Sequence, residues 1–193
     1  MELVFATNNK NKLKEVRLVV PEAFKILSLK DIGCDEELPE THETLEENSL
    51  EKAVYVREKY GYSCFSEDTG LEVEALNGEP GVYSARYAGT GLAEDNMEML
   101  LTKMLREENR KAQFRTIFTL ITDRFHEQFE GYIRGQIRNE QSGHEGFGYD
   151  PIFEPEGYNI TFSEMDPILK AKISHRGIAF KKLVTFLKSN PEI

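Results

Sequence analysis

The sequence predicts a single α/β domain built on a mixed β-sheet with flanking helices. Short apolar runs of strand composition alternate along the chain with stretches that place apolar residues at helical spacing. With 193 residues, 39% of them hydrophobic and 10% aromatic, the chain is long enough to bury one sizeable core. It contains no internal repeat, low-complexity tract or linker. We therefore expect one domain over residues 1–193.

The N-terminal part of the chain predicts a strand, a helix and a second strand. The first strand is expected at 3–6, and the helix after it places Leu13, Val16 and Val20 on one face. Residues 24–29, FKILSL, have the composition of the second strand.

A second helix is expected at 45–60. Thr44 and Glu47 have the spacing of a capping box at its start, and Gly61 follows as a stop signal. Strands are expected next at 62–66 and 71–75, around the polar break EDTG, and a loop at 76–91. A helix follows that carries Met97, Leu100, Leu101, Met104 and Leu105, and then a long strand at 112–122 with an antiparallel partner reaching Ile137. A glycine-rich loop is expected at 142–151, and the last helix has a buried stripe of Ala179, Leu183, Phe186 and Leu187.

Composition and charge exclude several classes of protein. No apolar run approaches the ~20 residues that span a bilayer, and no secretory signal peptide is visible. The net charge of −10 argues against a broad basic surface for polymeric nucleic acid, but it allows a small phosphorylated ligand held by local cations and a metal. Cys34 and Cys64 have no CxxC partner, which favours a reduced, cytoplasmic protein.

The first strand-to-helix junction is the first candidate site. Its residues are small, polar or cationic: Thr7, Asn8, Asn9, Lys10, Asn11 and Lys12. A helix start presents unpaired N–H groups and the positive end of the helix dipole, which suits an anion. The alternative is a turn in which asparagine caps the helix and the lysines face solvent.

Glu67 and Asp68, in the segment SEDTG, are the candidate acids. They follow a strand of buried composition, so we expect one carboxylate to point into a cleft beside the sheet. Mg²⁺ needs only one or two carboxylates besides phosphate oxygens, and a neighbouring carboxylate can accept a proton from water. The alternatives are a surface turn and an aspartic protease, whose Asp-Thr-Gly triplet needs a second copy that this chain lacks.

The acid-rich stretch at 31–51 supplies candidates for a second metal ligand, because it holds nine carboxylates and no Lys or Arg. A Leu-Pro pair holds the chain extended before Glu40, which makes Glu40 the favoured residue. Glu43, Glu46 and Glu47 suit a solvated helix face or compensation of the helix dipole.

The segment GFGYDP carries residues suited to a nucleobase. Gly146 and Gly148 give the backbone freedom, and Phe147 or Tyr149 can stack on a base. Asp150 can accept a hydrogen bond from a ring N–H. The alternative is a tight turn whose aromatic rings return to the core.

The segment KAKISHRG is expected to open the last helix. His175 and Arg176 form a pair of donors there, and Lys170 and Lys172 add cations. A lone histidine is usually structural, but a His-Arg pair beside two lysines indicates a binding role.

Together, these segments resemble the inosine triphosphate pyrophosphatase family, enzymes that hydrolyse non-standard purine nucleoside triphosphates. The matching stretches occur in order over residues 2–188 and are ATNNKNK, EDTGLEV, GEPGVYSARYAG, GFGYDPIF and KISHRG. The resemblance implies Mg²⁺-dependent attack of water that releases pyrophosphate and a nucleoside monophosphate from ITP, dITP or XTP. It also implies an elongated mixed α/β fold with an active-site cleft between two lobes, and a homodimer.

The resemblance further implies a role for each matching residue. Asp68 is similar to the catalytic base and metal ligand, and Glu40 to the second metal-binding acid. Residues 7–12 resemble the phosphate-binding turn, in which Asn8 stands where many members carry Gly. The other matches are to substrate contacts, of which the last two read the purine: Thr69, Phe147, Gly148, Tyr149, Asp150, Lys170, His175 and Arg176.

The predicted donors account for purine selectivity. Hypoxanthine and xanthine present an acceptor oxygen at position 6, which His175 and Arg176 can satisfy, whereas adenine presents an amino donor there. Three other interpretations stay open: a Maf-type nucleotide pyrophosphatase, which opens on a Ser- and Arg-rich turn, a non-catalytic nucleotide-sensing module, and a purely structural protein.

Overall fold

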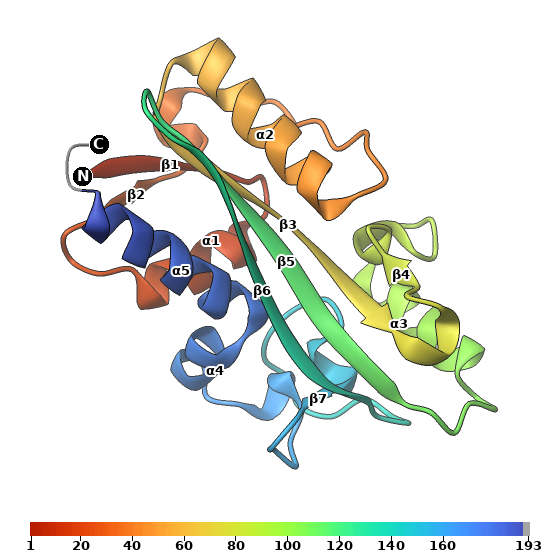
Figure 1. Cartoon of the computed structure of the whole chain (residues 1–193). Helices are drawn as coiled ribbons and strands as arrows, with labels where there is room; N and C mark the ends of the chain where they lie inside the picture. Colours follow the sequence, from red (N-terminus) through yellow and green to blue (C-terminus); the bar gives the residue numbers. More distant parts are fainter. Residues whose placement is uncertain (191–193) are drawn as a thin grey trace. The chain divides into compact units, whose positions relative to one another are not determined.

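The computed structural model describes residues 1–190 and confirms an α/β fold, in which helices flank a mixed β-sheet (Figure 1). The strands are β1 (Glu2–Ala6), β2 (Lys25–Leu27), β3 (Cys64–Val73), β4 (Pro80–Gly81), β5 (Lys111–Ile121), β6 (His126–Ile137) and β7 (Phe153–Pro155). The α-helices are α1 (Lys10–Val19), α2 (Leu45–Tyr60), α3 (Ala93–Lys103), α4 (Pro167–Ile173) and α5 (His175–Ser189). Short 3₁₀ turns lie at Lys30–Ile32, Glu74–Leu76, Ser84–Arg86, Asp150–Ile152 and Phe162–Glu164.

The sheet combines parallel and antiparallel pairs. Its order is β2-β1-β3-β5-β6-β7, with β4 paired to β3. β1 is parallel to both β2 and β3, whereas β4 is antiparallel to β3 and β7 is antiparallel to β6. No helix in residues 1–190 is long and apolar enough to cross a membrane.

The described chain divides into two compact units. Unit 1 comprises residues 1–68, 116–131 and 176–190, and unit 2 comprises residues 69–115 and 132–175. Strands β3, β5 and β6 contribute residues to both units, so no single cut in the chain separates them. The expectation of one domain stays a prediction.

Helices cover both faces of the sheet in unit 1 (Figure 1). On the face covered by α1 and α5, the rings of Phe5, Phe65 and Phe118 stack with centroids 4.6 to 6.1 Å apart. On the other face, Ala53 and Val56 of α2 pack into a second cluster. Both sides of the central strands are therefore buried, which explains their apolar sequences.

Unit 2 has a core of its own. Met97 and Leu100 of α3, and Met104 directly after the helix, pack there against residues of β3, β5 and β7. Phe114 and Phe153 meet edge to face in this core, with ring centroids 4.7 Å apart. Aromatic contact of this kind adds to the burial of apolar area and fixes how the elements of the unit pack.

β3 shows that the prediction of two strands around a polar break is wrong. Residues 64–73 form one continuous strand that includes EDTG, because the fold supplies partners for its buried polar side chains. Gly70 within this strand allows β4 to approach. A Cβ at residue 70 would lie 2.7 Å from the carbonyl oxygen of Gly81, too close for any side chain.

The ends of α2 confirm the predicted helix. Thr44 is the N-cap and its Oγ1 accepts from the N–H of Glu47 at 3.2 Å. The helix ends at Tyr60, and Gly61 follows with φ +76°, in the left-handed region.

The prediction that the segment KAKISHRG opens the last helix is wrong, because most of this segment lies before that helix. α4 ends at Ile173, Ser174 takes an extended conformation, and α5 begins at His175. The Ser174 N–H donates to the Lys170 carbonyl at 2.9 Å and so caps the shorter helix. Lys170 therefore belongs to α4.

Candidate active site

Glu67 and Asp68 are neighbours in β3, but their side chains lie on opposite faces of the sheet. Side chains alternate along a strand, so Phe65 and Glu67 face α1 and α5, whereas Ser66 and Asp68 face α2. Glu67 is 1% exposed and Asp68 is 6% exposed. The two acids are therefore both buried and meet different partners.

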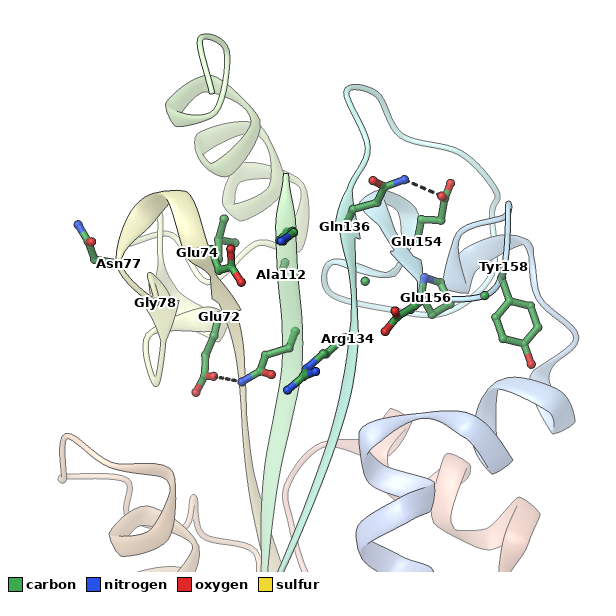
Figure 2. Close-up of a pocket in the computed structure, with 16 residues that line it drawn as sticks. Glu72, Glu74, Asn77, Gly78, Ala112, Arg134, Gln136, Glu154, Glu156 and Tyr158 are labelled. Carbon is green, nitrogen blue, oxygen red and sulfur yellow. Dashed lines mark hydrogen bonds between the residues drawn. The ribbon is translucent and has the colours of Figure 1, made fainter. Parts of the chain in front are cut away.

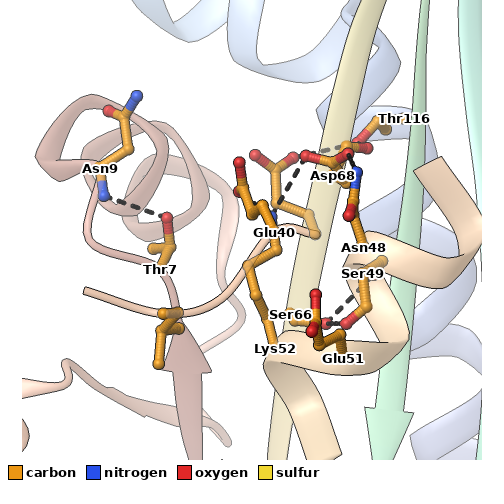
Figure 3. Close-up of polar contacts among 12 residues, drawn as sticks. Thr7, Asn9, Glu40, Asn48, Ser49, Glu51, Lys52, Ser66, Asp68 and Thr116 are labelled. Atoms are coloured by element: carbon orange, nitrogen blue, oxygen red, sulfur yellow. Dashed lines mark hydrogen bonds and ion pairs between the residues drawn. The ribbon is translucent and has the colours of Figure 1, made fainter. Parts of the chain in front are cut away.

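Two side chains of α2 contact the Asp68 carboxylate (Figure 3). Lys52 Nζ lies 3.2 Å from Oδ1, and Asn48 Nδ2 donates to Oδ2 at 3.3 Å. Asn48 and Lys52 are four residues apart, so they share one face of the helix. Each oxygen of Asp68 thus has its own donor, which fixes the orientation of the carboxylate.

The carboxylate of Glu40 is a second acid in contact with the Lys52 ammonium. Lys52 Nζ donates to Glu40 Oε1, so Glu40 and Asp68 share one cation (Figure 3). The Glu40 side chain is 37% exposed and that of Asp68 is 9% exposed. The shared position therefore has one buried and one more accessible carboxylate.

Asn8 fastens the segment that carries Glu40. Its Nδ2 donates to the carbonyl of Glu36 at 2.8 Å, and its Oδ1 accepts from the N–H of Leu38 at 2.9 Å. Both ends of the Asn8 amide thus bind the backbone just before Glu40. A glycine at this place would have no side chain to make either bond.

Glu67 faces cations on the other side of the sheet. Arg176 donates to it twice, from Nε to Oε2 at 2.9 Å and from Nη2 to Oε1 at 3.2 Å. Lys12 Nζ lies 2.8 Å from Oε1, and the Thr116 hydroxyl donates to Oε2 at 3.1 Å. Arg176 also pairs with Glu15 of α1. Within unit 1, the predicted phosphate lysine and the predicted purine-reading arginine therefore meet on one buried acid.

The pKa values of the two acids move in opposite directions. Burial raises the pKa of Glu67, but the charges of Arg176 and Lys12 outweigh burial and hold the pKa well below its usual value. Burial also raises the pKa of Asp68, and the attraction of Lys52 does not cancel it. A carboxylate with a raised pKa is the better proton acceptor near neutral pH, so Asp68 is the candidate base and Glu67 is a fixed negative charge.

The donor set at Glu40 and Asp68 fits a divalent cation. Both are hard oxygen donors, and they converge on one position that holds a positive charge. Among residues 1–190, no cluster of three or more His, Cys, Asp or Glu side chains is arranged to hold a metal. Two carboxylates are enough for Mg²⁺ when phosphate oxygens and water complete its coordination.

The turn at residues 7–12 caps α1 through Asn9. Asn9 Oδ1 accepts from the N–H groups of Asn11 at 2.9 Å and Lys12 at 3.3 Å, and its own N–H donates to Thr7 Oγ1 at 3.2 Å (Figure 3). Two of the N–H groups that the sequence analysis offered to an anion are therefore donated to a side chain. Lys10 and Asn11 are exposed.

Three predicted residues meet in unit 2 around Lys170. Its Nζ lies 2.6 Å from Asp150 Oδ2 and 5.0 Å from the centroid of the Phe147 ring. The Phe147 N–H donates to the same oxygen of Asp150 at 2.6 Å. Gly148, which lies between Phe147 and Asp150 in the sequence, has φ +63°, a conformation that favours glycine.

Tyr149 and His175 are buried in unit 2. Tyr149 is 4% exposed, and its hydroxyl donates to the Ser84 carbonyl at 2.9 Å. His175 is 3% exposed, and its ring stacks on Phe114 with centroids 4.7 Å apart. Thr69, which follows the catalytic candidate in β3, is partly buried.

The helix face that holds Asp68 was not among the predicted parts of the site. Lys52 is the first cation after the acid-rich stretch, and it follows Asn48 by four residues on a helix that was predicted with its correct bounds. That spacing was a usable signal. Glu15 and Thr116 gave none, because their partners, Arg176 and Glu67, are distant from them in sequence.

A pocket of about 830 Å³ lies on the sheet of unit 2 and is lined from β3, β5, β6 and β7 (Figure 2). Four of its polar side chains form two pairs, because Gln113 donates to Glu72 and Gln136 donates to Glu154, both at 2.7 Å. The lining includes none of the predicted site residues.

Known proteins resemble this chain over nearly its whole length. The model of the Ham1 family matches residues 3–186. A dITP/XTP pyrophosphatase of Flavobacterium psychrophilum is 53% identical over 98% of this chain and 100% of its own, and one of Porphyromonas gingivalis is 48% identical over 96% and 97%. The solved structure of the Staphylococcus aureus Ham1 protein has a TM-score of 0.88 at 35% identity, covering 98% of this chain and 100% of that one.

Proposed function

Because the chain belongs to the Ham1 family, we propose that it hydrolyses the non-standard purine nucleoside triphosphates ITP, dITP and XTP to the monophosphate and pyrophosphate. The observation that carries this proposal is the convergence of the Glu40 and Asp68 carboxylates on one cation position. The full-length relatives named dITP/XTP pyrophosphatase support the choice of substrate.

Asp68 is the proposed catalytic base. Its raised pKa suits it to take the proton of the attacking water, while Asn48 donates to one of its oxygens and orients the carboxylate. The water oxygen forms a bond to the α-phosphorus as its proton passes to Asp68. The bond between the α-phosphorus and the oxygen that bridges it to the β-phosphate breaks, and pyrophosphate leaves with that oxygen.

Glu40 and Asp68 are the residues that would hold Mg²⁺. The ion would supply positive charge to the phosphate oxygens and lower the pKa of a bound water. The dependence on Mg²⁺ is part of the proposal, and the oxygen donors of the two carboxylates support it.

The turn at residues 7–12 is proposed to bind the triphosphate. Its candidate residues are Thr7, Asn8, Asn9, Lys10, Asn11 and Lys12. Thr69, next to the proposed catalytic base Asp68, is a further candidate contact. Lys12 is the cation expected to matter most, because its ammonium is partly buried and beside Glu67, on the strand that carries Asp68. A local positive charge is needed, since the chain as a whole carries −10.

Residues of the glycine-rich loop and of the last two helices are proposed to bind the base. Phe147 would stack on the purine, and Asp150 would accept from a ring N–H, with Gly148, Tyr149 and Lys170 supporting the loop. His175 and Arg176 would donate to the oxygen at position 6. Adenine would leave such donors without an acceptor, which disfavours ATP.

We propose further that the chain acts as a cytoplasmic homodimer and binds neither polymeric nucleic acid nor membranes. The net charge of −10 supports the absence of a nucleic-acid surface, because phosphate-backbone binding needs clustered cations.

The experiment that tests the function is product analysis by ³¹P NMR after incubation with ITP and Mg²⁺. We expect IMP and pyrophosphate in equal amounts. Asp68→Asn should lower turnover by about 10²- to 10⁴-fold, the usual contribution of a general base. The control, Asp123→Asn, makes the same charge change at a side chain that is 82% exposed and should leave turnover unchanged.

Three outcomes would contradict the proposal. ITP binding without any product would make the chain a nucleotide-binding module. Hydrolysis confined to other bases would favour a Maf-type activity. Turnover by Asp68→Asn equal to that of the wild type would remove Asp68 from the mechanism.

A further inference from the structure

A side chain of the protein occupies the position between Glu40 and Asp68. Lys52 donates to Glu40 Oε1 and lies 3.2 Å from Asp68 Oδ1 (Figure 3). These are the two carboxylates that the proposed function assigns to the metal ion. A metal bound by both would therefore meet an ammonium at close range.

Lys52 is well suited to hold this position. Its side chain is 5% exposed, so the ammonium has little water to solvate it and depends on the two acids. The Lys52 ammonium contacts both carboxylates, and these two negative charges stabilise its positive charge. Removal of either acid would leave a buried charge with less compensation.

We propose that Lys52 is an internal cation that competes with the divalent metal ion for Glu40 and Asp68. Lys52 keeps the two carboxylates together when no metal is bound, and its ammonium withdraws when they take up the metal. The inference rests on the proposed function, because it assumes that the carboxylate pair receives a metal. Lys52 is here a positioning residue, since it acts through the two acids.

The competition has a consequence for the order of binding. Because like charges repel, Lys52 weakens metal binding to the nucleotide-free protein. A triphosphate offers the displaced ammonium a new anionic partner, so metal and nucleotide should each strengthen the binding of the other. The site would then fill with both together rather than with metal alone.

The test is Mn²⁺ binding to the nucleotide-free protein at pH 8, measured by electron paramagnetic resonance. Lys52→Met should bind Mn²⁺ at least about tenfold more tightly than the wild type, because the repulsion at short range is gone. Lys52→Arg, which keeps the charge, should bind as weakly as the wild type. Lys181→Met removes the same charge from an exposed place on α5 and should change nothing.

The tighter Mn²⁺ binding of Lys52→Met must depend on the carboxylates of Glu40 and Asp68. Adding Asp68→Asn to Lys52→Met should abolish the tighter binding. If Lys52→Met binds Mn²⁺ no more tightly than the wild type, or if neither binds measurably, the inference is overturned.

A second measurement covers the case in which Lys52→Met does not fold. In wild-type protein labelled with ¹³Cε-lysine, the Lys52 signal, assigned by its loss in Lys52→Arg, should shift during a Mg²⁺ titration while the Lys181 signal stays fixed. A Lys52 signal that does not move at saturating Mg²⁺ would overturn the inference. Neither titration contains substrate, so a failure of the proposed hydrolysis, seen separately with ITP, is distinguishable from a failure of this inference.

Discussion

At the scale of single residues, the position of a carboxylate on a strand decides its chemistry. Glu67 and Asp68 are adjacent acids, yet Glu67 meets Arg176 and Lys12 while Asp68 meets Asn48 and Lys52. The first is held ionised, and the second has a raised pKa. Adjacent groups with divergent pKa values are typical of sites that separate charge balance from proton transfer.

This difference predicts unequal losses of stability for two similar substitutions. Glu67→Gln should lower the free energy of unfolding at pH 7 by about 3–5 kcal/mol, because Arg176 and Lys12 lose a buried counter-charge. Asp68→Asn should cost less, because a raised pKa means that the ionised Asp68 is less favourable in the folded than in the unfolded chain. Urea unfolding of both variants measures the difference, and equal losses would contradict the account.

Asn8 gives a second prediction at this scale. Asn8→Gly should speed amide hydrogen exchange at Leu38, because the N–H of Leu38 donates to the Asn8 side chain. Asn8→Asp keeps an acceptor there and should leave the Leu38 amide protected. Mass spectrometry or NMR can follow the exchange, and unchanged protection in Asn8→Gly would show that the bond does not hold the segment before Glu40.

At the scale of elements, α2 links the site to the rest of unit 1. One face of the helix carries Asn48 and Lys52 toward Asp68. Farther along, Glu36 accepts from Lys59 Nζ at 2.7 Å and from the Tyr60 hydroxyl at 3.1 Å, and it also pairs with Tyr55. The helix therefore anchors the beginning of the segment that carries Glu40.

The anchor at Glu36 predicts a pH-dependent contribution to stability. Hydrogen bonds from Lys59 and Tyr55 lower the pKa of Glu36 from 4.5 to about 2. A lowered pKa in the folded state adds stability above the unfolded value, and this stability is lost as the pH falls from 4.5 toward about 2. The difference in melting temperature between the wild type and Glu36→Gln should accordingly be largest at neutral pH and shrink below pH 4.5.

A double-mutant cycle provides the control. In a Lys59→Met background, Glu36→Gln should cost less at pH 7 than in the wild type, because one partner of the carboxylate is already gone. A cost that is the same in both backgrounds, or that does not vary with pH, would exclude the anchor.

The elements also show which features a sequence reveals. The bounds of α2 followed from local signals, since its N-cap, its first-turn acid and its terminal glycine are neighbours in the chain. β3 was split wrongly because its charged residues resemble a break unless their partners are known. Lys12 and Arg176 are far from Glu67 in sequence, and only the fold brings them to it. Local chemistry was therefore predictable, and long-range charge pairing was not.

At the scale of the whole molecule, the predicted site residues form two groups. Asp68, Glu40, Lys12 and Arg176 belong to unit 1, and the residues around Lys170 belong to unit 2. Each group is organised within its own unit by ion pairs and hydrogen bonds. The proposed division of labour assigns phosphate chemistry to the first group and recognition of the base, apart from Arg176, to the second.

This division predicts different kinetic effects for the two groups. Lys12→Ala should lower kcat/KM for every nucleoside triphosphate by a similar factor, because the phosphates are common to all. Phe147→Ala should mainly weaken binding of the nucleobase. Its effect on the cleavage of inorganic tripolyphosphate, which has no base, should therefore be small. Steady-state assays of pyrophosphate release and of tripolyphosphate cleavage separate the two, and a base-dependent effect of Lys12→Ala would contradict the assignment.

The central claim is that this chain selects and hydrolyses non-standard purine nucleoside triphosphates, and kcat/KM for pyrophosphate release across a panel tests it most directly. With Mg²⁺ present, ITP, dITP and XTP should each exceed ATP by about 10²-fold or more, because adenine leaves buried donors without an acceptor. ATP turnover equal to that of ITP, or no pyrophosphate from any member of the panel, would contradict the account.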